Sequence, residues 1–421
     1  MPGDFEDMET VTGHNPKEAA VLPSPCPSDL LVVAWLYNTN GMASWCWEAA
    51  HALHELGHNV LLIAAPDTPL PGIPLVEVVR IGEPDDHAYQ RSRGMKALHT
   101  VSRHLAAGPN GVLLNTHKYL EDRGVRPAAY ILNQTSLVDR RVPCLQIVTA
   151  WGYPVSLLAY LRKIPLLVPD KTLRSFLHVG LLWVGWWRRD WRGYRAADLV
   201  LPVTHALLTS LHRRSVTASL AYPGTSVGPA PNCRGGGIRL LMAAIQLNEP
   251  RKRILWMLDA MKEAILPPGC VLQLAGEPDE SVRQAASRLN IPVEFLGRLK
   301  RPELQKVMQQ ADIFCFGSLL DDWGYVLVEA MANGLIPVAP AISPFDEIMG
   351  VAGLGYRPHS QVEFVSVLCS VTSSSLVDKR QQVWERAHSL FSREAFGRSI
   401  LESVESAISL RMIRHGKGIG S

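Results

Sequence analysis

The sequence has no Cys-x-x-Cys pair, and its seven cysteines are scattered at positions 26, 46, 144, 233, 270, 315 and 369. An odd number of separated cysteines argues against a full disulfide framework and suits a reducing compartment. No His or Cys cluster has the spacing of a metal site, and no Asp-x-Asp pair is present. We therefore expect a cytoplasmic protein without a bound metal or cofactor.

Long apolar runs are also missing. The longest, Phe176 to Trp187, is shorter than the ~20 residues that a membrane-spanning helix needs. Residues 1–28 contain Asp4, Glu6 and Asp7 among several prolines, which is neither the basic start nor the apolar run of a signal peptide. We expect no transmembrane helix, and we interpret residues 1–28 as a disordered tail.

The chain has no strong excess of charge, since 42 Lys plus Arg face 39 Asp plus Glu, for a net charge of +3. This balance gives no reason to expect nucleic acid as a partner. No Gly-x-Gly-x-x-Gly follows the first predicted strand of either half, which disfavours a dinucleotide-dependent dehydrogenase. The segment Trp183–Arg192 mixes tryptophans with arginines, which fits either an interfacial membrane helix or ordinary packing, and we favour packing.

What the chain does have is a repeated alternation of apolar runs and helical patterns. In the first half Leu30–Leu36 and Val60–Ala65 are predicted strands around a helix at 43–56 that Gly57 ends. Further predicted strands are Gly111–Leu114, Cys144–Thr149 and Asp198–Val203. Short, continuously apolar strands are typical of a parallel sheet covered by helices on both faces.

The segment from Ala221 to Gly237 is rich in proline and glycine and is the strongest linker signal. Beyond it the sequence predicts a helix at Arg251–Leu266, with an apolar stripe formed by Ile254, Met257, Leu258, Met261 and Ile265. The predicted strands there are Arg239–Ala244, Val271–Ala275, Val293–Leu296, Asp312–Phe316 and Ile336–Ala339, and Tyr325–Ala332 is a predicted helix.

A chain of 421 residues exceeds the ~250–300 residues at which single cores stop growing. We predict an α/β protein with two doubly wound Rossmann-like domains facing a central cleft. We expect residues 29–225 to form the N-terminal domain and residues 226–392 the C-terminal domain. We expect the last segment, 393–421, to pack back toward the N-terminal domain.

The segment Asp321 to Glu329 carries the clearest chemistry. It follows a predicted strand and opens a helix, so the backbone amides of Gly324, Tyr325 and Val326 are free donors at a helix start, where an anion such as a diphosphate binds. Glu329 lies further along the helix, where its carboxylate accepts hydrogen bonds from ribose or sugar hydroxyls. We expect Asp321 in the preceding loop to face the same crevice.

The spacing of Asp321 and Glu329 resembles the Glu-x7-Glu motif of the retaining glycosyltransferases of family four, which have the two-domain B-type fold. The segments 271–278, 294–298, 311–314 and 40–53 resemble the strands, turns and first helix of that family. The resemblance implies that a sugar passes from a nucleotide-diphosphate sugar, as co-substrate, to an acceptor hydroxyl with retention. It implies that the domain at 226–392 binds the nucleotide sugar and that the domain at 29–225 binds the acceptor. It implies catalytic roles for Glu329, Asp321 and Lys252. It implies donor contacts from Gly41, Gln246, Arg251, Lys252, Gly276, Glu277, Arg298, Trp323, Gly324, Tyr325, Val326 and Glu329.

Three positions depart from the family pattern. Gln246 stands at the family's phosphate-binding Arg, Asp321 at its first Glu, and Trp151 where many members have a His near the transferred sugar. A neutral amide does not replace a guanidinium, so another cation must compensate. Trp151 is an acceptor-side candidate because its ring can stack on a sugar or cyclitol. His117 follows a predicted strand end, and we weigh acceptor contact against a plain loop histidine, which we favour.

Two alternatives remain open. Gln246 and Trp151 fit a catalytically weak nucleotide-sugar-binding protein that acts as a partner or regulatory module. A B-fold epimerase or phosphorylase shares the expected architecture and differs in needing no acceptor or in needing inorganic phosphate. The acceptor, whether a small molecule, a glycan or a lipid, depends on pocket shape.

Overall fold

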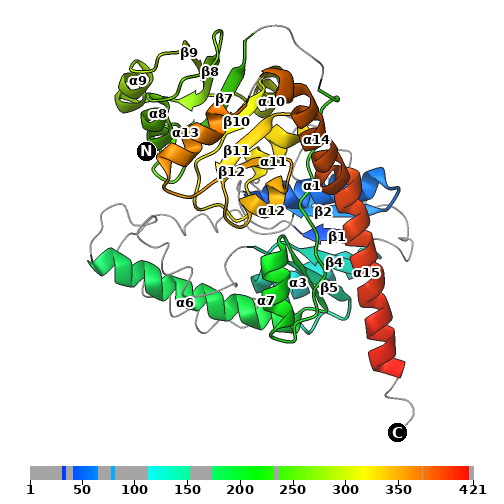
Figure 1. Ribbon diagram of the computed structural model, residues 1–421. Helices are drawn as coiled ribbons and strands as arrows, with labels where there is room; N and C mark the ends of the chain where they lie inside the picture. Colours follow the sequence, from blue (N-terminus) through cyan, green and yellow to red (C-terminus); the bar gives the residue numbers. More distant parts are fainter. Residues whose placement is uncertain are drawn as a thin grey trace, which may run out of the picture.

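The computed structural model describes residues 31–34, 41–64, 77–80, 112–151, 173–231, 237–371 and 373–416 (Figure 1). The predicted tail at residues 1–28 lies outside these residues. Two six-stranded sheets are formed, one on each side of the predicted linker at 221–237. Each sheet is the centre of one lobe, called here the N lobe and the C lobe.

The N-lobe sheet is entirely parallel, in the order β3-β2-β1-β4-β5-β6. Its strands are β1 (Leu31–Ala34), β2 (Val60–Ala64), β3 (Glu77–Arg80), β4 (Ala129–Leu132), β5 (Leu145–Ala150) and β6 (Leu199–Pro202). Four of these strands lie where the apolar runs predicted them. The described side chains of β4, β5 and β6 are buried throughout, as expected for strands covered on both faces.

The C-lobe sheet is also parallel, in the order β12-β11-β10-β7-β8-β9. Its strands are β7 (Arg239–Gln246), β8 (Val271–Glu277), β9 (Val293–Gly297), β10 (Ile313–Cys315), β11 (Ile336–Pro340) and β12 (Leu354–Tyr356). Counted from the first strand of each lobe, the two sheets have the same strand order. The prediction of two doubly wound domains is therefore confirmed.

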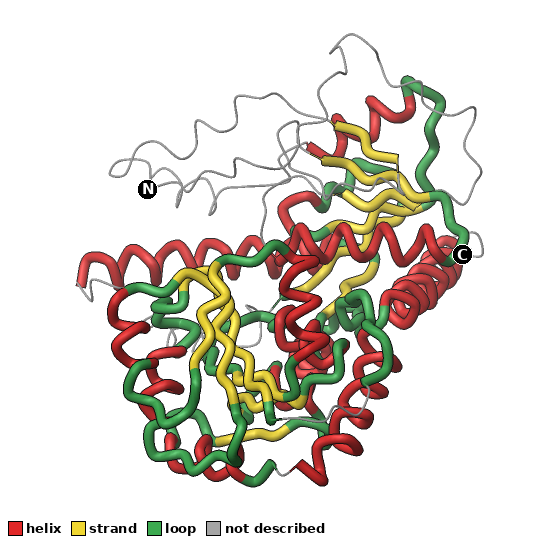
Figure 2. The backbone as a smooth tube through the Cα atoms, turned by 90° about the horizontal axis from the view of Figure 1, so that it is seen from above, coloured by secondary structure: helices red, strands yellow, loops and turns green. Residues whose placement is uncertain are grey.

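Helices flank the strands on both sides (Figure 2). In the N lobe they are α1 (Gly41–Glu55), α3 (Val112–Glu121), the 3-10 turn η2 (Thr135–Leu137), α6 (Leu173–Ala196) and α7 (His205–His212). In the C lobe they are α8 (Ile254–Met261), α9 (Glu280–Ala286), α10 (Arg301–Gln310), α11 (Tyr325–Ala332), α12 (Phe345–Met349), α13 (Gln361–Cys369) and α14 (Ser373–Phe391), followed by α15 (Arg393–Gly416). Gly57, at φ +87°, ends α1 by donating its amide to His54.

Two element predictions are wrong. The run Gly111–Leu114 is not a strand, because residues from Val112 onward form α3; a short apolar run has no period that separates strand from helix. The helix predicted at Arg251–Leu266 is reduced to α8, since Arg253 takes a left-handed conformation at φ +55° directly before it. Ile265 falls outside the shortened helix and is 90% exposed, although the other four members of the predicted stripe are buried.

The apolar core is continuous between the lobes. One buried cluster contains Trp45 of α1 together with Leu327 of α11 and Phe396 of α15. Figure 1 shows α14 beside the upper lobe and α15 running down the side of the lower one. The ring of Phe396 meets that of Trp45 edge to face at 5.4 Å, and Ser403 of α15 donates to the Ser219 hydroxyl at 3.1 Å. The last helix thus ties the C lobe to the N lobe.

The second half of the aromatic and basic segment of α6 packs on its own lobe. Trp191 is buried, meets Trp187 edge to face at 6.4 Å and contacts Tyr194, while Arg188 and Arg192 are exposed. The side chains of Trp183 and Trp186 lie outside the described residues, and the choice of packing over membrane contact for the whole segment stays a prediction. Among the described helices, none is long and apolar enough to cross a membrane.

Candidate active site

The C-lobe candidate residues gather where the strand order of the sheet reverses. β7 and β10 are neighbours in the sheet, and the chain leaves them toward opposite sides, into α8 and α11. In doubly wound sheets the crevice outside the carboxyl ends of two such strands is where ligands bind. The segment after β7 carries Arg251 and Lys252, and the segment after β10 carries Asp321.

Lys252, Arg251 and Asp321 are in direct contact, and we call them the phosphate-side cluster. The Lys252 Nζ donates to Asp321 Oδ2 at 2.9 Å and to Oδ1 at 3.2 Å, and Arg251 reaches Oδ1 at 3.4 Å. Arg251 is also held by Glu249 at 2.7 Å. The Lys252 side chain is 18% exposed and that of Asp321 is 16% exposed, so the pair is partly desolvated and still open to a ligand.

The helix start beside this cluster has unpaired donors. Gly324 caps α11 at φ +83°, and its carbonyl accepts from the amides of Leu327 and Val328. Within the described residues, no acceptor contacts the amides of Tyr325 and Val326. A left-handed cap requires glycine in most proteins, and free amides at a helix start attract anions. Lys252, held against Asp321 three residues before Gly324, adds a positive charge next to this tip.

Trp323 does not present its side chain to this crevice. It is 1% exposed, and its ring stacks on Tyr222 at 5.4 Å and meets Phe391 edge to face at 5.6 Å. The expectation of a donor contact by this indole is corrected here. An aromatic residue next to a glycine cap fills the core beneath the helix.

Glu329 meets a different set of charges from Asp321. Its Oε1 accepts from Arg301 of α10 at 2.8 Å, and the same Arg301 nitrogen donates to Glu48 of α1 at 3.1 Å. Arg393 of α15 binds the other Glu48 oxygen at 2.5 Å and contacts Glu55 at 3.4 Å. Burial raises the pKa of Glu329, and the Arg301 guanidinium opposes that rise. We call Glu48, Arg301, Glu329 and Arg393 the inter-lobe charge chain.

Across the lobe boundary, Trp151 lies at the end of β5 with its ring centroid 6.4 Å from that of Tyr325. Its indole nitrogen donates to Thr149 at 2.9 Å, and the ring is 7% exposed. The Tyr325 hydroxyl is buried and contacts no polar partner within the described residues. The acceptor-side candidate Trp151 therefore lies against the first residue of α11, where the N lobe meets the helix tip.

The remaining donor candidates lie at the edges of this region. Gln246 donates to Glu277 at 2.5 Å, and both side chains are exposed, so the amide at the family's Arg position is bound to a carboxylate. Gly276 has φ +141°, and a Cβ there would lie 1.9 Å from the Ala244 carbonyl oxygen, so close packing on β7 requires glycine. Arg298 is exposed after β9, and Gly41 is the first residue of α1.

His117 is not a loop residue, and the loop interpretation is wrong. It lies in α3, is 3% exposed, and its Nδ1 bonds the Tyr130 hydroxyl of β4 at 2.9 Å. Its Nε2 lies 3.3 Å from Glu121 one helical turn away. An imidazole enclosed between a helix and the sheet has no face for an acceptor, and its role is packing.

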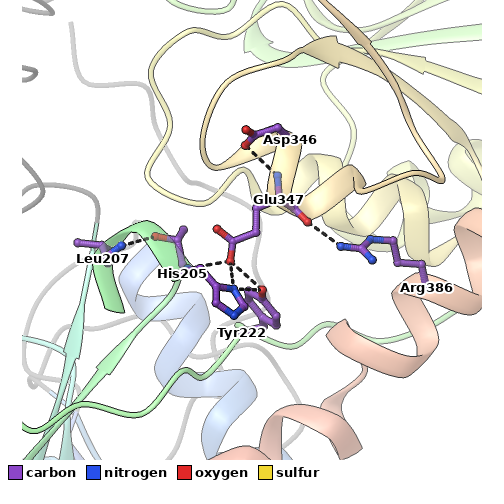
Figure 3. A network of polar contacts seen from close by, with 7 residues as sticks. His205, Leu207, Tyr222, Asp346, Glu347 and Arg386 are labelled. Atoms are coloured by element: carbon purple, nitrogen blue, oxygen red, sulfur yellow. Dashed lines mark hydrogen bonds and ion pairs between the residues drawn. The ribbon is translucent and has the colours of Figure 1, made fainter. Parts of the chain in front are cut away.

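A second polar contact joins the lobes away from the inter-lobe charge chain (Figure 3). Glu347 Oε1 of α12 accepts from the Tyr222 hydroxyl at 2.7 Å, and from the backbone amide and ring of His205, the first residue of α7, each at 2.8 Å. Arg386 of α14 donates to the Glu347 carbonyl at 2.7 Å. A carboxylate from the C lobe thus satisfies donors at the start of an N-lobe helix.

Sequence reasoning missed Arg301, Arg393 and the role of Glu48. Glu48 carried a usable signal, because it is a charge within an apolar helical pattern between Trp47 and Ala49, and a buried charge needs a partner. The partner had no local signal, since Arg301 is 253 positions away. Among the described residues, no group of His, Cys, Asp and Glu side chains is arranged to hold a metal ion.

Residues 238–374 match the model of the family described as Glycosyl transferases group 1. These residues are a glycosyl transferases group 1 domain. The match covers about a third of the chain and contains the phosphate-side cluster and α11. Gly41, Glu48 and Trp151 lie outside it.

Curated relatives of this glycosyl transferases group 1 domain include the phosphatidyl-myo-inositol mannosyltransferase of Mycobacterium tuberculosis (strain CDC 1551 / Oshkosh), 31% identical over 112 residues. The same-named protein of Mycolicibacterium smegmatis is 31% identical over 111 residues. The match with the first covers 26% of this chain and 30% of the relative, so it spans less than a third of that protein's length.

Solved structures resemble nearly the whole chain. Sucrose-phosphate synthase from Thermosynechococcus elongatus superposes with a TM-score of 0.58 at 16% identity, covering 93% of this chain and all of that one. Anabaena Alr3699/HepE in complex with UDP superposes with a TM-score of 0.58 at 16% identity, covering 90% of this chain and all of that one. At such identities the likeness shows the fold, and the chain has the B-type glycosyltransferase fold.

Proposed function

We propose that this protein is a metal-independent glycosyltransferase that moves a sugar from a nucleotide-diphosphate sugar to an acceptor hydroxyl with retention of configuration. The observation that carries the proposal is the ion pair of Lys252 with Asp321, three residues before the glycine cap of α11, at the point where the strand order reverses. A diphosphate placed there receives a positive charge and two backbone donors. The glycosyl transferases group 1 domain supports sugar transfer as the reaction class.

In the proposed reaction the bond between the anomeric carbon and the terminal diphosphate oxygen breaks, and the nucleoside diphosphate leaves. The acceptor oxygen forms its bond to the anomeric carbon on the same face, and its proton passes to the leaving phosphate oxygen. Lys252 and the amides of Tyr325 and Val326 stabilise the negative charge that develops on that phosphate. Glu329 and Asp321 orient hydroxyl groups of the ribose and sugar.

The contacts within the phosphate-side cluster have to change when the donor binds. Lys252 and Arg251 both contact Asp321, so a diphosphate competes with this carboxylate for the two cations. Arg251 is the cation placed to compensate for Gln246, whose amide is held by Glu277 instead. Once Lys252 turns to the phosphate, Asp321 is free to accept a hydrogen bond from a sugar hydroxyl.

The acceptor in this proposal approaches from the N lobe, past Trp151. The relatives named phosphatidyl-myo-inositol mannosyltransferase make mannose a first choice of sugar and phosphatidyl-myo-inositol a first choice of acceptor. Trp151 is 7% exposed beside Tyr325, so in this proposal it shapes the N-lobe side of the approach. A cytoplasmic location fits the seven scattered cysteines, of which the five described form no disulfide.

A second candidate function is a nucleotide-sugar-binding protein without turnover. It is favoured by the Gln246–Glu277 contact, which leaves an amide and a carboxylate where the family pattern has a cation. Such a protein would bind its nucleotide sugar and serve as a partner or regulatory module.

One experiment separates the two. Thermal unfolding is measured with a panel of UDP, GDP and ADP sugars, and the donors that protect the protein are then assayed for transfer to phosphatidyl-myo-inositol and to simple sugars. Transfer with the anomeric configuration kept, and without dependence on added metal, supports the glycosyltransferase. Protection with neither transfer nor donor hydrolysis supports the binding protein. Protection by none of the donors contradicts both.

A further inference from the structure

Arg301 occupies the centre of the inter-lobe charge chain. It is the first residue of α10, and one of its guanidinium nitrogens contacts two carboxylates that belong to different lobes, Glu48 of α1 and Glu329 of α11. The Glu48 side chain is 1% exposed and that of Glu329 is 21% exposed. Two carboxylates this close, both largely removed from water, need positive charge between them to stay ionised.

The two carboxylates differ in how much they depend on Arg301. Glu48 has a second cation, because Arg393 binds its other oxygen. Within the described residues, no second cation contacts Glu329. If Arg301 is removed, Glu48 therefore keeps a cation beside its negative charge and Glu329 does not. In the proposed function Glu329 is the carboxylate that faces the donor.

A small recess lies beside Arg301 and Glu329. Its volume is about 20 Å³, which is room for about one water molecule, and its wall includes Thr225 of the linker and Asn333 just beyond α11. Thr225 Oγ1 and Asn333 Oδ1 are buried and contact no hydrogen-bond partner in the described part of the chain. The Arg301 side chain stays 48% exposed, so it is not a sealed core residue.

We propose that Arg301 is the positioning residue of the donor site: it holds the Glu329 carboxylate charged and oriented for ribose or sugar hydroxyls and ties it to Glu48 of the opposite lobe. This inference rests on the proposed function, in which Glu329 contacts the donor. An ionised carboxylate accepts two or more hydroxyl hydrogen bonds, whereas a protonated one has lost part of that capacity. Arg301 itself need not touch the donor.

The direction of the pH effect follows from the groups that face Glu329. Arg301 faces it from α10, Glu48 from α1 and Tyr325 from its own helix, with Arg393 of α15 behind Glu48. Burial raises the pKa of Glu329, Arg301 lowers it and Glu48 raises it. Without Arg301 the pKa rises further, so Glu329 takes up its proton at a higher pH. Donor binding then fails at a higher pH than in the native protein.

The test compares Arg301→Gln and Arg301→Lys with the control Arg393→Gln. Arg393 belongs to the inter-lobe charge chain but does not contact Glu329. Donor affinity is measured by calorimetry between about pH 5 and about pH 9, with whichever of the UDP, GDP or ADP sugars protects the native protein. We expect Arg301→Gln to weaken binding by about 10- to 100-fold and to move the acid limb up by about one pH unit. Arg301→Lys keeps the charge and so keeps the acid limb near its native position. Arg393→Gln leaves the limb unchanged, while thermal unfolding checks that each variant is folded.

A double substitution separates this inference from the proposed function. If Arg301 acts through Glu329, Arg301→Gln combined with Glu329→Gln binds the donor no more weakly than Glu329→Gln alone. Additive losses, or an acid limb that stays in place in Arg301→Gln, overturn the positioning role and leave the glycosyltransferase proposal intact. A donor that binds equally well to the native protein and to Glu329→Gln overturns the assignment of Glu329 and with it the role of Arg301, whereas the glycosyltransferase proposal stands or falls on the transfer assay.

Discussion

Asp321 and Glu329 lie eight positions apart and obtain their cations from different parts of the molecule. Both cations of Asp321, Lys252 and Arg251, come from the segment after β7 in the same lobe. The cation of Glu329, Arg301, is shared with Glu48 of the N lobe. The first contact forms within the C lobe alone, and the second also depends on how the two lobes are placed.

From this difference we infer that Asp321 and Glu329 have different roles, although they belong to one short motif. The phosphate-side cluster supplies charge at a fixed place in the C lobe, beside the α11 tip. The inter-lobe charge chain links Glu329 to Glu48 of the N lobe through Arg301. In the proposed function Glu329 faces the donor and the N lobe presents the acceptor. Substitutions within the phosphate-side cluster are therefore expected to change chemistry, and those at inter-lobe contacts to change coupling between the lobes.

The largest expected effect is on activity, and it distinguishes the roles of Lys252 and Arg251, the two cations that contact Asp321. Lys252→Met removes the ammonium that faces the leaving diphosphate, and we expect kcat/KM to fall by roughly 100- to 1,000-fold. Arg251→Met is the comparison, and we expect a smaller loss, because Arg251 lies farther from Asp321 and is also held by Glu249. Steady-state rates with the accepted donor measure both. Equal losses in the two variants would mean that Lys252 has no special place at the phosphate.

The next effect concerns a cation–carboxylate pair remote from the proposed chemistry. Arg380 of α14 is 4% exposed, bonds Asp312 at 3.0 Å and donates to the Gly334 carbonyl at 2.9 Å. Arg380→Met leaves a buried carboxylate without this partner, and we expect unfolding to become easier by about 3 kcal/mol. Lys252→Met should cost stability within about 1 kcal/mol, because Asp321 keeps its contact with Arg251 when Lys252 is replaced. Urea unfolding measures both losses of stability. A larger loss in Lys252→Met than in Arg380→Met would contradict the view that the phosphate-side cluster serves chemistry and not stability.

The smallest effect tests the second lobe contact. Tyr222→Phe removes the hydroxyl that donates to Glu347 and keeps the ring stacked on Trp323. We expect a loss of about 1 kcal/mol in unfolding free energy, because the two His205 contacts to Glu347 remain. Urea unfolding is again the measurement, with Tyr119→Phe as the control, since this tyrosine lies in α3 and its ring lies under Arg123. A larger loss of unfolding free energy in Tyr119→Phe than in Tyr222→Phe would mean that the Tyr222–Glu347 contact does not stabilise the pairing of the lobes.

Much of the fold follows from local patterns. Continuous apolar runs predicted nine of the strands, because a strand buried on both faces has to be apolar throughout. The start of α11 was predictable because Gly324 supplies the left-handed cap that begins the helix. The short run at Gly111–Leu114 misled because four apolar residues fit a helix as well as a strand.

The site was predictable only where its parts are close in sequence or match a family pattern. Lys252 and Asp321 come after neighbouring strands, so the topology brings them together. Arg301 could not be placed, because its contact with Glu48 depends on how two lobes pack. Trp323 and His117 were misjudged for the same reason: an aromatic or imidazole ring near a strand end is exposed or buried according to tertiary neighbours that no local pattern encodes.

The central claim, that a diphosphate is held by Lys252 and the tip of α11, is tested most directly by amide hydrogen exchange. The nucleoside diphosphate of the accepted donor is added to the native protein and to Lys252→Met at the same concentration. The account predicts slower exchange at the amides of Tyr325 and Val326 in the native protein and little slowing in the variant. Slowed exchange confined to other segments, with these two amides unchanged, would contradict it.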